Sequence, residues 1–268
     1  MIGQKTPPDK EERRAFRQRK AGAAQKRQPP DFVIIGAQKG GTTSLYRYLT
    51  EHPDVGGATK KEVHFFDRSY HKGMDWYLAH FPERGESTVV GESSPSYLFH
   101  PDVPERVRRT LPHAKLIVLL RNPVDRAYSQ YQMRLRRVGE DSFEEAVDEE
   151  LARLPSNGEL PGPEKGHHAF LPRGVYADQL QRWLAVFPRE QFLMLHSEAF
   201  FARPDEGLLR TLAFLGMPPW RPAAFEVHNP GAYGEMKPET RRRLQEFYAP
   251  HNRRLYDLLG RDFGWDDV

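Results

Sequence analysis

The feature that most constrains the fold is a short apolar run that leads into a glycine-rich turn. Residues 32–35 (FVII) read as a buried strand, and residues 45–49 repeat apolar side chains at helical spacing. Between them lies the turn AQKGGTT, residues 37–43. A strand, a glycine turn and a helix in this order aim backbone N–H groups and a helix N-terminus at an anion. Because Gly40 and Gly41 carry no Cβ, the backbone is expected to approach that anion closely, so the stretch predicts a phosphate site.

The turn differs from the phosphate loop of ATP-binding proteins, which reads G-x-x-x-x-G-K-[ST]. Gly36 and Gly41 keep the glycine spacing, but Thr42 stands where the lysine should be. The lysine has moved into the turn, as Lys39, beside the phosphate nearest the backbone. This placement suits a short anion chain with one transferable group next to the first phosphate. Thr42 and Thr43 add hydroxyl groups at the start of the helix.

The composition is that of a globular chain, with 38% hydrophobic and 29% charged residues in 268. The chain holds no cysteine, which excludes disulfides, cysteine-ligated metals and cysteine nucleophiles. No apolar run approaches the ~18 residues of a membrane span, and no secretory signal is visible. We therefore expect a cytoplasmic protein without a transmembrane segment.

Positive charge is concentrated near the N-terminus. Residues 1–30 carry nine Lys or Arg against three Asp or Glu, whereas the remainder carries 31 against 34. With few apolar side chains, residues 1–30 are expected to form a disordered basic tail, followed by a single domain over residues 31–268. Since the domain itself has no basic surplus, no nucleic-acid partner is expected.

Strand patterns alternate with helical patterns along the rest of the chain. We expect strands at residues 32–35, near 55, and at 88–92, 114–120 and 191–195. We expect helices through 45–49, stopped by His52-Pro53, and at 73–81, 103–110, 126–138 (capped by Asp125), 142–154 (capped by Ser142), 176–187, 205–215 and 238–259. Residues 155–172, rich in Pro and Gly, read as a loop. The alternation predicts a P-loop-like, three-layer α/β/α fold with a central parallel sheet.

A second anion site is expected after the strand at residues 114–120. A magnesium-dependent kinase needs an acidic residue at such a strand end, but this strand delivers Arg121, whose planar fork binds phosphate. Ser129 follows in the second turn of the next helix, within reach of the same group. Ligands of a parallel sheet bind beyond the carboxyl ends of its strands. Lys39, Glu92 and Arg121 all come at or just after strand ends, so we expect them to share one crevice.

Two phosphate sites suit a nucleoside with a phosphate at each end. No metal site is expected, because the pair His167-His168 has no third ligand at suitable spacing.

Several segments, in this order and spacing, resemble the sulfotransferase family: KGGTTSLYRYLTEHPDV, KEVHFFD, GMDWYLAHFP and LIVLLRNPVDRAYSQY. The likeness runs from about residue 32 to residue 265, and it is greatest to the heparan sulfate glucosaminyl 3-O-sulfotransferases and their bacterial relatives. It implies transfer of a sulfuryl group from 3′-phosphoadenosine 5′-phosphosulfate (PAPS), with no metal required, to a hydroxyl or amine. The acceptor would be a carbohydrate or a small molecule.

The resemblance also implies roles for individual residues. The 5′-phosphosulfate would be held by Lys39, Gly40, Gly41, Thr42 and Thr43, and the 3′-phosphate by Arg121 and Ser129. Glu62 matches the family's general base, and His64 and Asp67 match its active-site partners. Lys39 would also neutralise charge on the oxygen that leaves sulfur. We expect the apolar neighbours of Glu62 to raise its pKa toward a value suited to a base.

Two segments depart from the family's pattern. Residues 93–97 read SSPSY where glycan-modifying relatives have K-[ST]-P-x-Y, and residues 229–231 read NPG where the family has a lysine–glycine–arginine loop. The first departure leaves carbohydrate, lipid and aryl acceptors open, with Trp76, Tyr77, Tyr97 and residues 155–172 as candidates to line the pocket. The second leaves Tyr233 and Lys237 as candidates for the 3′ side of the nucleotide.

Two other functions compete with sulfuryl transfer. One is a magnesium-dependent nucleotide or sugar kinase, which the displaced lysine argues against. The other is a non-catalytic nucleotide-binding protein, which would need no base at Glu62. In that case Glu62 would pair with Lys60 or Lys61 on a solvated loop, and His64 would be an interior histidine. O- versus N-sulfation and the oligomeric state are open at this level.

Overall fold

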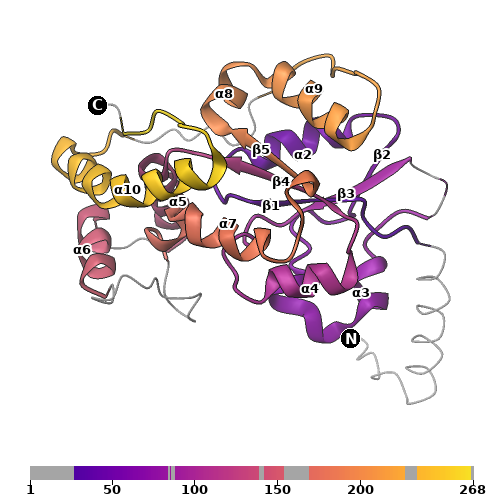
Figure 1. Cartoon of the computed structure of the whole chain (residues 1–268), viewed down its shortest axis with the longest axis horizontal. Helices are drawn as coiled ribbons and strands as arrows, with labels where there is room; N and C mark the ends of the chain where they lie inside the picture. The colour runs from indigo at the N-terminus through magenta and orange to yellow at the C-terminus, as the bar shows by residue number, and fades with distance from the viewer. Residues whose placement is uncertain are drawn as a thin grey trace, which may run out of the picture.

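A five-stranded parallel sheet forms the centre of the chain (Figure 1). The computed structural model describes residues 27–83, 85, 88–138, 142–153, 169–226 and 234–266. The strands are β1 (Phe32–Gly36), β2 (Val55–Gly57), β3 (Val89–Ser93), β4 (Lys115–Leu120) and β5 (Phe192–His196), in the spatial order β2-β3-β1-β4-β5. Each neighbouring pair is parallel.

Helices cover both faces of this sheet and one of its ends (Figure 1). The α-helices of the described residues are α2 (Thr42–Thr50), α3 (Met74–Leu78), α4 (Val103–Thr110), α5 (Pro123–Val138), α6 (Phe143–Arg153), α7 (Tyr176–Leu184), α8 (Ser197–Ala202), α9 (Pro204–Leu215) and α10 (Pro238–Leu259). On one face lie α2, α8 and α9, and on the other α3, α4 and α7, whereas α5, α6 and α10 gather at one end. The predicted α/β/α architecture with a central parallel sheet is confirmed. No helix in the described part of the chain combines the length and apolar character that a membrane span requires.

Alternate residues of the inner strands belong to two different hydrophobic clusters. Val33 and Ile35 of β1 pack with α3, α4 and α7, whereas Phe32 and Ile34 pack with α2, α8 and α9. In strand β4, the even-numbered residues 116, 118 and 120 belong to the first cluster, and Ile117 and Leu119 belong to the second. Because side chains alternate across a strand, a strand covered on both faces must be apolar at every position. This explains the unbroken apolar runs FVII (residues 32–35) and LIVLL (residues 116–120).

Local signals explain several element boundaries. Ser142 and Glu145 form a capping box at the start of α6: the Ser142 hydroxyl accepts the Glu145 N–H at 3.3 Å, and the Glu145 carboxylate accepts the Ser142 N–H at 2.7 Å. The predicted Ser142 cap is thus confirmed. The predicted Asp125 cap is wrong, since α5 begins at Pro123 and Asn122 accepts the Val124 N–H at 3.0 Å. Asp125 instead pairs with Arg241 of α10 at 2.7 Å.

Two elements had no clear signal in the sequence. Helix α8 follows β5 directly, so no turn residues separate the two. A π-helical turn spans Phe65–Ser69, in a segment for which the sequence predicted no regular structure. The predicted loop at 155–172 lies outside the described residues up to residue 168. Residues 1–26 of the predicted basic tail also lie outside them.

The start of the domain at residue 31 stays a prediction. Arg27 already forms an antiparallel bridge with Glu83, and the Gln28 N–H donates to the Pro82 carbonyl at 3.3 Å. These contacts put the last residues of the predicted tail against the segment that precedes β3.

Candidate active site

The glycine turn lies between β1 and α2, at the carboxyl end of the central strand. Two of its residues adopt the left-handed backbone region, with φ of 71° at Lys39 and 95° at Gly41. Helix α2 then begins with no side-chain cap and no acidic residue in its first turn. Its first N–H groups and the positive end of its dipole are therefore available to an anion. Thr42 is buried in that first turn and Thr43 is half-buried.

The two glycines of the turn are required by neighbouring protein atoms. A Cβ on Gly40 would lie 2.5 Å from the Leu119 carbonyl oxygen, and one on Gly41 would lie 2.9 Å from the Phe201 ring. The Gly40 carbonyl also accepts the Ser197 hydroxyl at 2.8 Å. That these glycines also make room for the anion stays a prediction, and the structure adds a second reason for them. They let the turn pack against β4 and α8, and the packed turn presents the start of α2.

Arg121 joins the turn from the neighbouring strand. It directly follows β4, and its guanidinium donates from Nη1 to the Lys39 carbonyl at 3.2 Å. Its own carbonyl accepts the Tyr176 hydroxyl of α7 at 2.9 Å. The structure therefore brings the two predicted anion-binding segments into contact. Ser129 lies on α5, with only 5% of its surface exposed.

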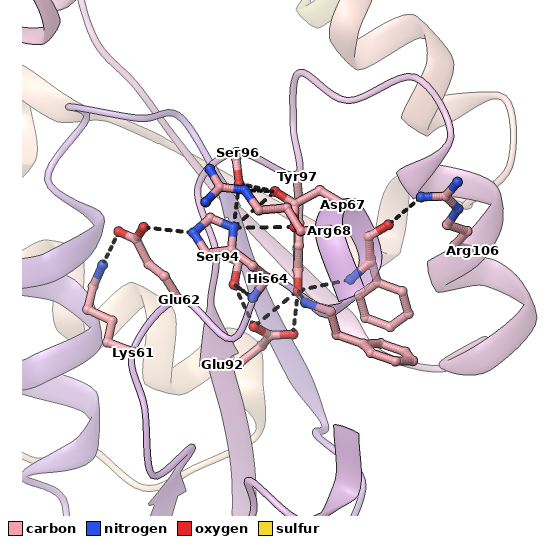
Figure 2. A network of polar contacts seen from close by, with 12 residues as sticks. Lys61, Glu62, His64, Asp67, Arg68, Glu92, Ser94, Ser96, Tyr97 and Arg106 are labelled. Atoms are coloured by element: carbon pink, nitrogen blue, oxygen red, sulfur yellow. Dashed lines mark hydrogen bonds and ion pairs between the residues drawn. The ribbon is translucent and has the colours of Figure 1, made fainter. Parts of the chain in front are cut away.

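Glu62 and His64 lie on the segment between β2 and the π-helical turn, and their side chains point toward each other (Figure 2). The Glu62 N–H donates to the carbonyl of Ser93, the last residue of β3, at 3.1 Å. Since β3 pairs with β1, this bond places Glu62 at the same edge of the sheet as the glycine turn. Glu62 and His64 both have left-handed backbones, with φ of 60° and 54°. Such conformations are unfavourable for side chains with a Cβ and persist only where surrounding contacts hold them.

A chain of ion pairs links the polar side chains of this segment (Figure 2). Lys61 Nζ lies 2.9 Å from Glu62 Oε1, and Glu62 Oε2 lies 3.3 Å from His64 Nε2. On its other side, His64 Nδ1 lies 3.0 Å from Asp67 Oδ2. The Ser96 hydroxyl donates to the same Asp67 oxygen at 2.7 Å. His64 thus has a carboxylate at each ring nitrogen, which fixes the orientation of its imidazole.

These contacts overturn the predicted pKa of Glu62. The hydrogen bond from His64 is the largest influence and, with Lys61, it lowers the pKa of Glu62 to about 2 although burial opposes the shift. The apolar neighbours Phe65 and Phe66 were expected to raise this pKa, but their side chains are buried in the core beneath the loop. The carboxylate itself is 42% exposed and paired. Glu62 is therefore ionised at any ordinary pH.

His64 is shifted in the opposite direction. Burial favours the neutral imidazole, but hydrogen bonds to Asp67 and Glu62 outweigh it and raise the pKa of His64 to about 8. Burial likewise opposes the ionised form of Asp67, and its bonds with His64 and Ser96 prevail, so the pKa of Asp67 is lowered. At neutral pH the three side chains form a carboxylate–imidazolium–carboxylate arrangement.

We expect turnover to rise as the pH increases through about 8. Below that pH, His64 carries a proton that holds the carboxylate of Glu62, the residue that the resemblance implies as the base, and lowers its affinity for a proton. Deprotonation of His64 removes its positive charge and leaves one N–H for the two carboxylates, so the proton affinity of Glu62 rises. The pH dependence of kcat measures the effect, and Asp67→Asn should move the rise to lower pH because Asp67 raises the pKa of His64. A profile that is flat from pH 6 to 9 would contradict this coupling.

Glu92 does not lie in the crevice where the sequence placed it. It is the fourth residue of β3, pairs in register with Val33 of β1 and is fully buried. Its carboxylate accepts hydroxyl groups from Tyr77 at 2.6 Å, Ser94 at 2.8 Å and Tyr97 at 3.2 Å. Burial, partly opposed by these hydrogen bonds, raises the pKa of Glu92 to about 7.

The remaining candidates for the acceptor pocket and for the 3′ side of the nucleotide are buried, paired or outside the described residues. Tyr77 and Tyr97 have no exposed surface, so the prediction that they line an acceptor pocket is wrong. Trp76 is half-buried, with Lys72 Nζ 4.4 Å from its ring centroid. Lys237 pairs with Glu144 at 3.4 Å. Tyr233, residues 229–231 and the pair at 167–168 lie outside the described residues.

Two serines, Ser96 and Ser197, contact the site although the sequence did not predict it. Ser96 bonds Asp67 from the turn after β3, and Ser197 bonds the glycine turn from α8. Only the polar run at 93–96 gave a signal for the first, and nothing in the local pattern pointed to the second. Among the described residues, no group of three or more His, Asp or Glu side chains has the geometry of a metal site.

Comparisons with known proteins bear on the family and the fold. The profile of the sulfotransferase domain matches residues 29–229. Heparan sulfate glucosamine 3-O-sulfotransferase 3A1 of Mus musculus is 35% identical over 265 residues, covering 90% of this chain and 65% of the relative. Heparan sulfate glucosamine 3-O-sulfotransferase 6 of Homo sapiens is also 35% identical, covering 90% and 75%. The chain thus spans about two thirds to three quarters of these relatives.

A solved structure shares the fold over nearly its whole length. The crystal structure of a sulfotransferase from Alicyclobacillus acidocaldarius has a TM-score of 0.72 and 34% identity, covering 89% of this chain and 99% of that one. The domain match, the sequence relatives and the shared fold agree with one another and confirm the resemblance that the motifs indicated. This chain belongs to the sulfotransferase family.

Proposed function

We propose that this enzyme transfers the sulfuryl group of PAPS to a hydroxyl group of a carbohydrate. One observation carries the proposal: the Glu62–His64–Asp67 chain stands at the end of β3, beside the glycine turn at the end of β1 and Arg121 at the end of β4. A base and two anion-binding segments thus share one edge of the sheet. The names of the relatives, which are heparan sulfate glucosamine 3-O-sulfotransferases, favour a sugar hydroxyl as the acceptor.

The described residues fit a donor with phosphate groups at two positions. The uncapped start of α2 and the Lys39–Thr43 turn would hold the 5′-phosphosulfate. Arg121 and Ser129 would hold the 3′-phosphate, since a guanidinium and a hydroxyl are both donors to phosphate oxygens. PAPS supplies the activated sulfuryl group, and the protein contributes positioning and charge.

The transfer exchanges one sulfur–oxygen bond for another. The acceptor oxygen forms a bond to sulfur as the bond from sulfur to the bridging oxygen of the 5′-phosphate breaks. The proton of the acceptor hydroxyl passes to the Glu62 carboxylate, which His64 orients. Lys39 offsets the negative charge that develops on the departing oxygen. The products are a sulfate ester and 3′-phosphoadenosine 5′-phosphate.

The decisive experiment compares donors and acceptors on the wild-type chain. Sulfur-35-labelled PAPS and phosphorus-32-labelled ATP with magnesium would each be offered with heparan sulfate oligosaccharides, neutral sugars, aryl alcohols and a lipid alcohol. Label in a carbohydrate from PAPS alone supports the proposal. Transfer from ATP would favour the kinase, label only in an aryl or lipid acceptor would reject the carbohydrate, and tight nucleotide binding without transfer would favour a binding protein.

We expect Arg121→Ala to weaken binding of 3′-phosphoadenosine 5′-phosphate by about 10- to 100-fold, because a charged hydrogen bond to phosphate contributes roughly 1.5–3 kcal/mol. The matched control is Arg109→Ala, an exposed arginine of α4. Calorimetric titration gives both affinities, and thermal unfolding shows whether the fold is kept. Equal affinities for the two variants would show that Arg121 does not bind the nucleotide and only stabilises the glycine turn through the Lys39 carbonyl.

We also expect the bisphosphate product to bind without magnesium. The proposed site meets the phosphates with Lys39, Arg121 and backbone N–H groups, so a bridging cation has no role to fill. Calorimetry with excess EDTA and with magnesium chloride should give the same affinity. A strict requirement for magnesium would overturn this view of the donor site.

A cytoplasmic location stays a prediction, which fractionation of cells that produce the chain would test. Amine acceptors, and a disordered state of residues 1–30, likewise stay predictions.

A further inference from the structure

The backbone that carries Glu62 and His64 is held by β3 and by the turn that follows this strand. The His64 N–H donates to the Ser94 hydroxyl at 3.2 Å. The next two N–H groups, of Phe65 and Phe66, donate to the Tyr97 hydroxyl at 2.9 Å and 3.3 Å. These bonds act where the chain adopts left-handed conformations, which need such support.

The two hydroxyls that accept these hydrogen bonds, of Ser94 and Tyr97, both donate hydrogen bonds to the Glu92 carboxylate (Figure 2). Ser94 donates to Glu92 Oε2 at 2.8 Å, and Tyr97 donates to Glu92 Oε1 at 3.2 Å. A hydroxyl has one proton to donate, so the carboxylate fixes where that proton points. The oxygen lone pairs are then turned toward the backbone N–H groups of residues 64–66.

We propose that Glu92 is a positioning residue for the reaction: through the hydroxyls of Ser94 and Tyr97, it holds the backbone that presents Glu62 and His64. The inference rests on the proposed function, because it concerns the same base. It assigns no proton transfer to Glu92, whose carboxylate is fully buried and is occupied by three hydroxyl donors.

The cost of burying this carboxyl group supports a role beyond packing. Moving an ionisable group out of water is unfavourable, and apolar residues of similar size often stabilise a core better. A neutral glutamine cannot replace the carboxylate either, since it offers one oxygen and one NH₂ group. The NH₂ group would face a hydroxyl that now donates to the carboxylate, and that hydroxyl would have to turn its proton toward a backbone N–H.

Two variants, Glu92→Gln and Ser94→Ala, test the inference. The matched control is Tyr46→Phe, which removes a buried tyrosine hydroxyl that, like the Ser94 hydroxyl, joins a loop amide to β3. Tyr46 accepts the Ala58 N–H at 2.8 Å and donates to the Gly91 carbonyl at 3.2 Å. Ala58 begins the loop, four residues before Glu62, and Tyr46 bonds none of the amides of residues 64–66, so any loss of stability common to the three variants is separated from loss of positioning.

The first readout is the titration of His64, followed by NMR of its imidazole and assigned through its absence in His64→Gln. The groups that shift this titration are Glu62, Asp67 and Arg68. In wild type the midpoint should lie near 8. Glu92→Gln and Ser94→Ala should move it toward the ordinary value, because the carboxylates no longer meet both ring nitrogens, whereas Tyr46→Phe should leave it in place.

The second readout is kinetic. Glu92→Gln should lower kcat by roughly 10- to 100-fold, the scale expected when reacting groups shift by about 1 Å, while the affinity for 3′-phosphoadenosine 5′-phosphate stays within about twofold. Ser94→Ala should show a smaller loss of the same kind, and Tyr46→Phe should keep its kcat. An unchanged His64 titration in Glu92→Gln and Ser94→Ala, or equal kinetic losses in all three variants, would overturn the inference.

The two proposals can fail separately. If the wild-type chain transfers no sulfuryl group to any acceptor, the proposed function is lost, but the His64 titration still shows whether Glu92 positions the loop. Should Glu92→Gln fail to fold, Ser94→Ala can be compared with Tyr46→Phe instead. Each of these variants removes one hydroxyl that donates a hydrogen bond to β3, from Ser94 to Glu92 and from Tyr46 to Gly91.

Discussion

Glu62→Gln is expected to lower turnover by roughly 10²–10⁴, the range for loss of general acid–base catalysis. Glutamine keeps the length of the side chain and an oxygen that can accept from Lys61, but it cannot take the proton of the acceptor hydroxyl. The affinity for 3′-phosphoadenosine 5′-phosphate should be unchanged, because Glu62 is anchored on β3 and its side chain is paired with Lys61 and His64. Steady-state turnover with PAPS, measured beside calorimetric binding of the product nucleotide, separates the two effects.

The control for this variant is Glu105→Gln, which removes a carboxylate from the exposed face of α4. It makes the same chemical change away from the base and should keep full turnover. If Glu62→Gln also keeps near-normal turnover, Glu62 is not the base. His64 would then be the next candidate, since the buried Glu92 cannot reach a bound acceptor.

Lys39→Met is expected to damage both binding and turnover. Methionine is one atom shorter but likewise unbranched, and it places no new demand on the backbone, since both residues carry a Cβ at a φ of 71°. Loss of a preorganised cationic donor at a developing oxyanion costs on the order of 10²–10³ in kcat. Nucleotide affinity should fall as well, since the ammonium group would contact the 5′-phosphosulfate in the ground state.

The matched control is Lys60→Met, an exposed lysine outside the turn. Product affinity should match that of wild type in this variant, because Lys60 lies outside the proposed donor contacts. A Lys39→Met protein that loses affinity but keeps kcat would show that Lys39 binds the donor without stabilising the leaving oxygen. Unchanged values for both would remove Lys39 from the site.

The sheet could be predicted from the sequence because its inner strands are buried on both faces. FVII (residues 32–35) and LIVLL (residues 116–120) are apolar at every position, and only strands covered by helices on two sides require this. Helix α4 was predicted with its exact bounds, since its apolar residues Val103 and Val107 are four apart and Pro104 stands in its first turn. Helix α8 was not predicted, because Ser197 continues directly from β5 without a turn.

The position of the candidate site at one edge of the sheet could be predicted from the sequence, but the pKa of its proposed base could not. Lys39, Arg121, Glu62 and His64 do lie at one edge of the sheet, since each follows or bonds to a strand end. The pKa of Glu62 was predicted in the wrong direction because a sequence shows the apolar neighbours but hides that His64 folds back to pair with the carboxylate. That contact depends on the left-handed backbone at both residues, which no local propensity favours.

The aromatic residues show a further limit of the sequence. Tyr77 and Tyr97 were predicted as candidates to line an acceptor pocket. Both are instead buried, with hydroxyls that donate to the Glu92 carboxylate, which lies 15 residues from Tyr77 and five from Tyr97 in the sequence. Such a polar contact leaves no periodic pattern in the chain.

The strand order separates the two substrates by chain segment. The proposed donor contacts come from β1, β4 and the helices that follow them, whereas the proposed acceptor side comes from residues 58–72 and the turn after β3, at the other side of the central strand. Substitutions that adapt the chain to a new sugar can therefore accumulate in the second group without altering nucleotide contacts. A sheet of this order allows relatives to diversify in what they modify while keeping one donor, and it makes residues 58–72 and 94–100 the natural unit to exchange between them.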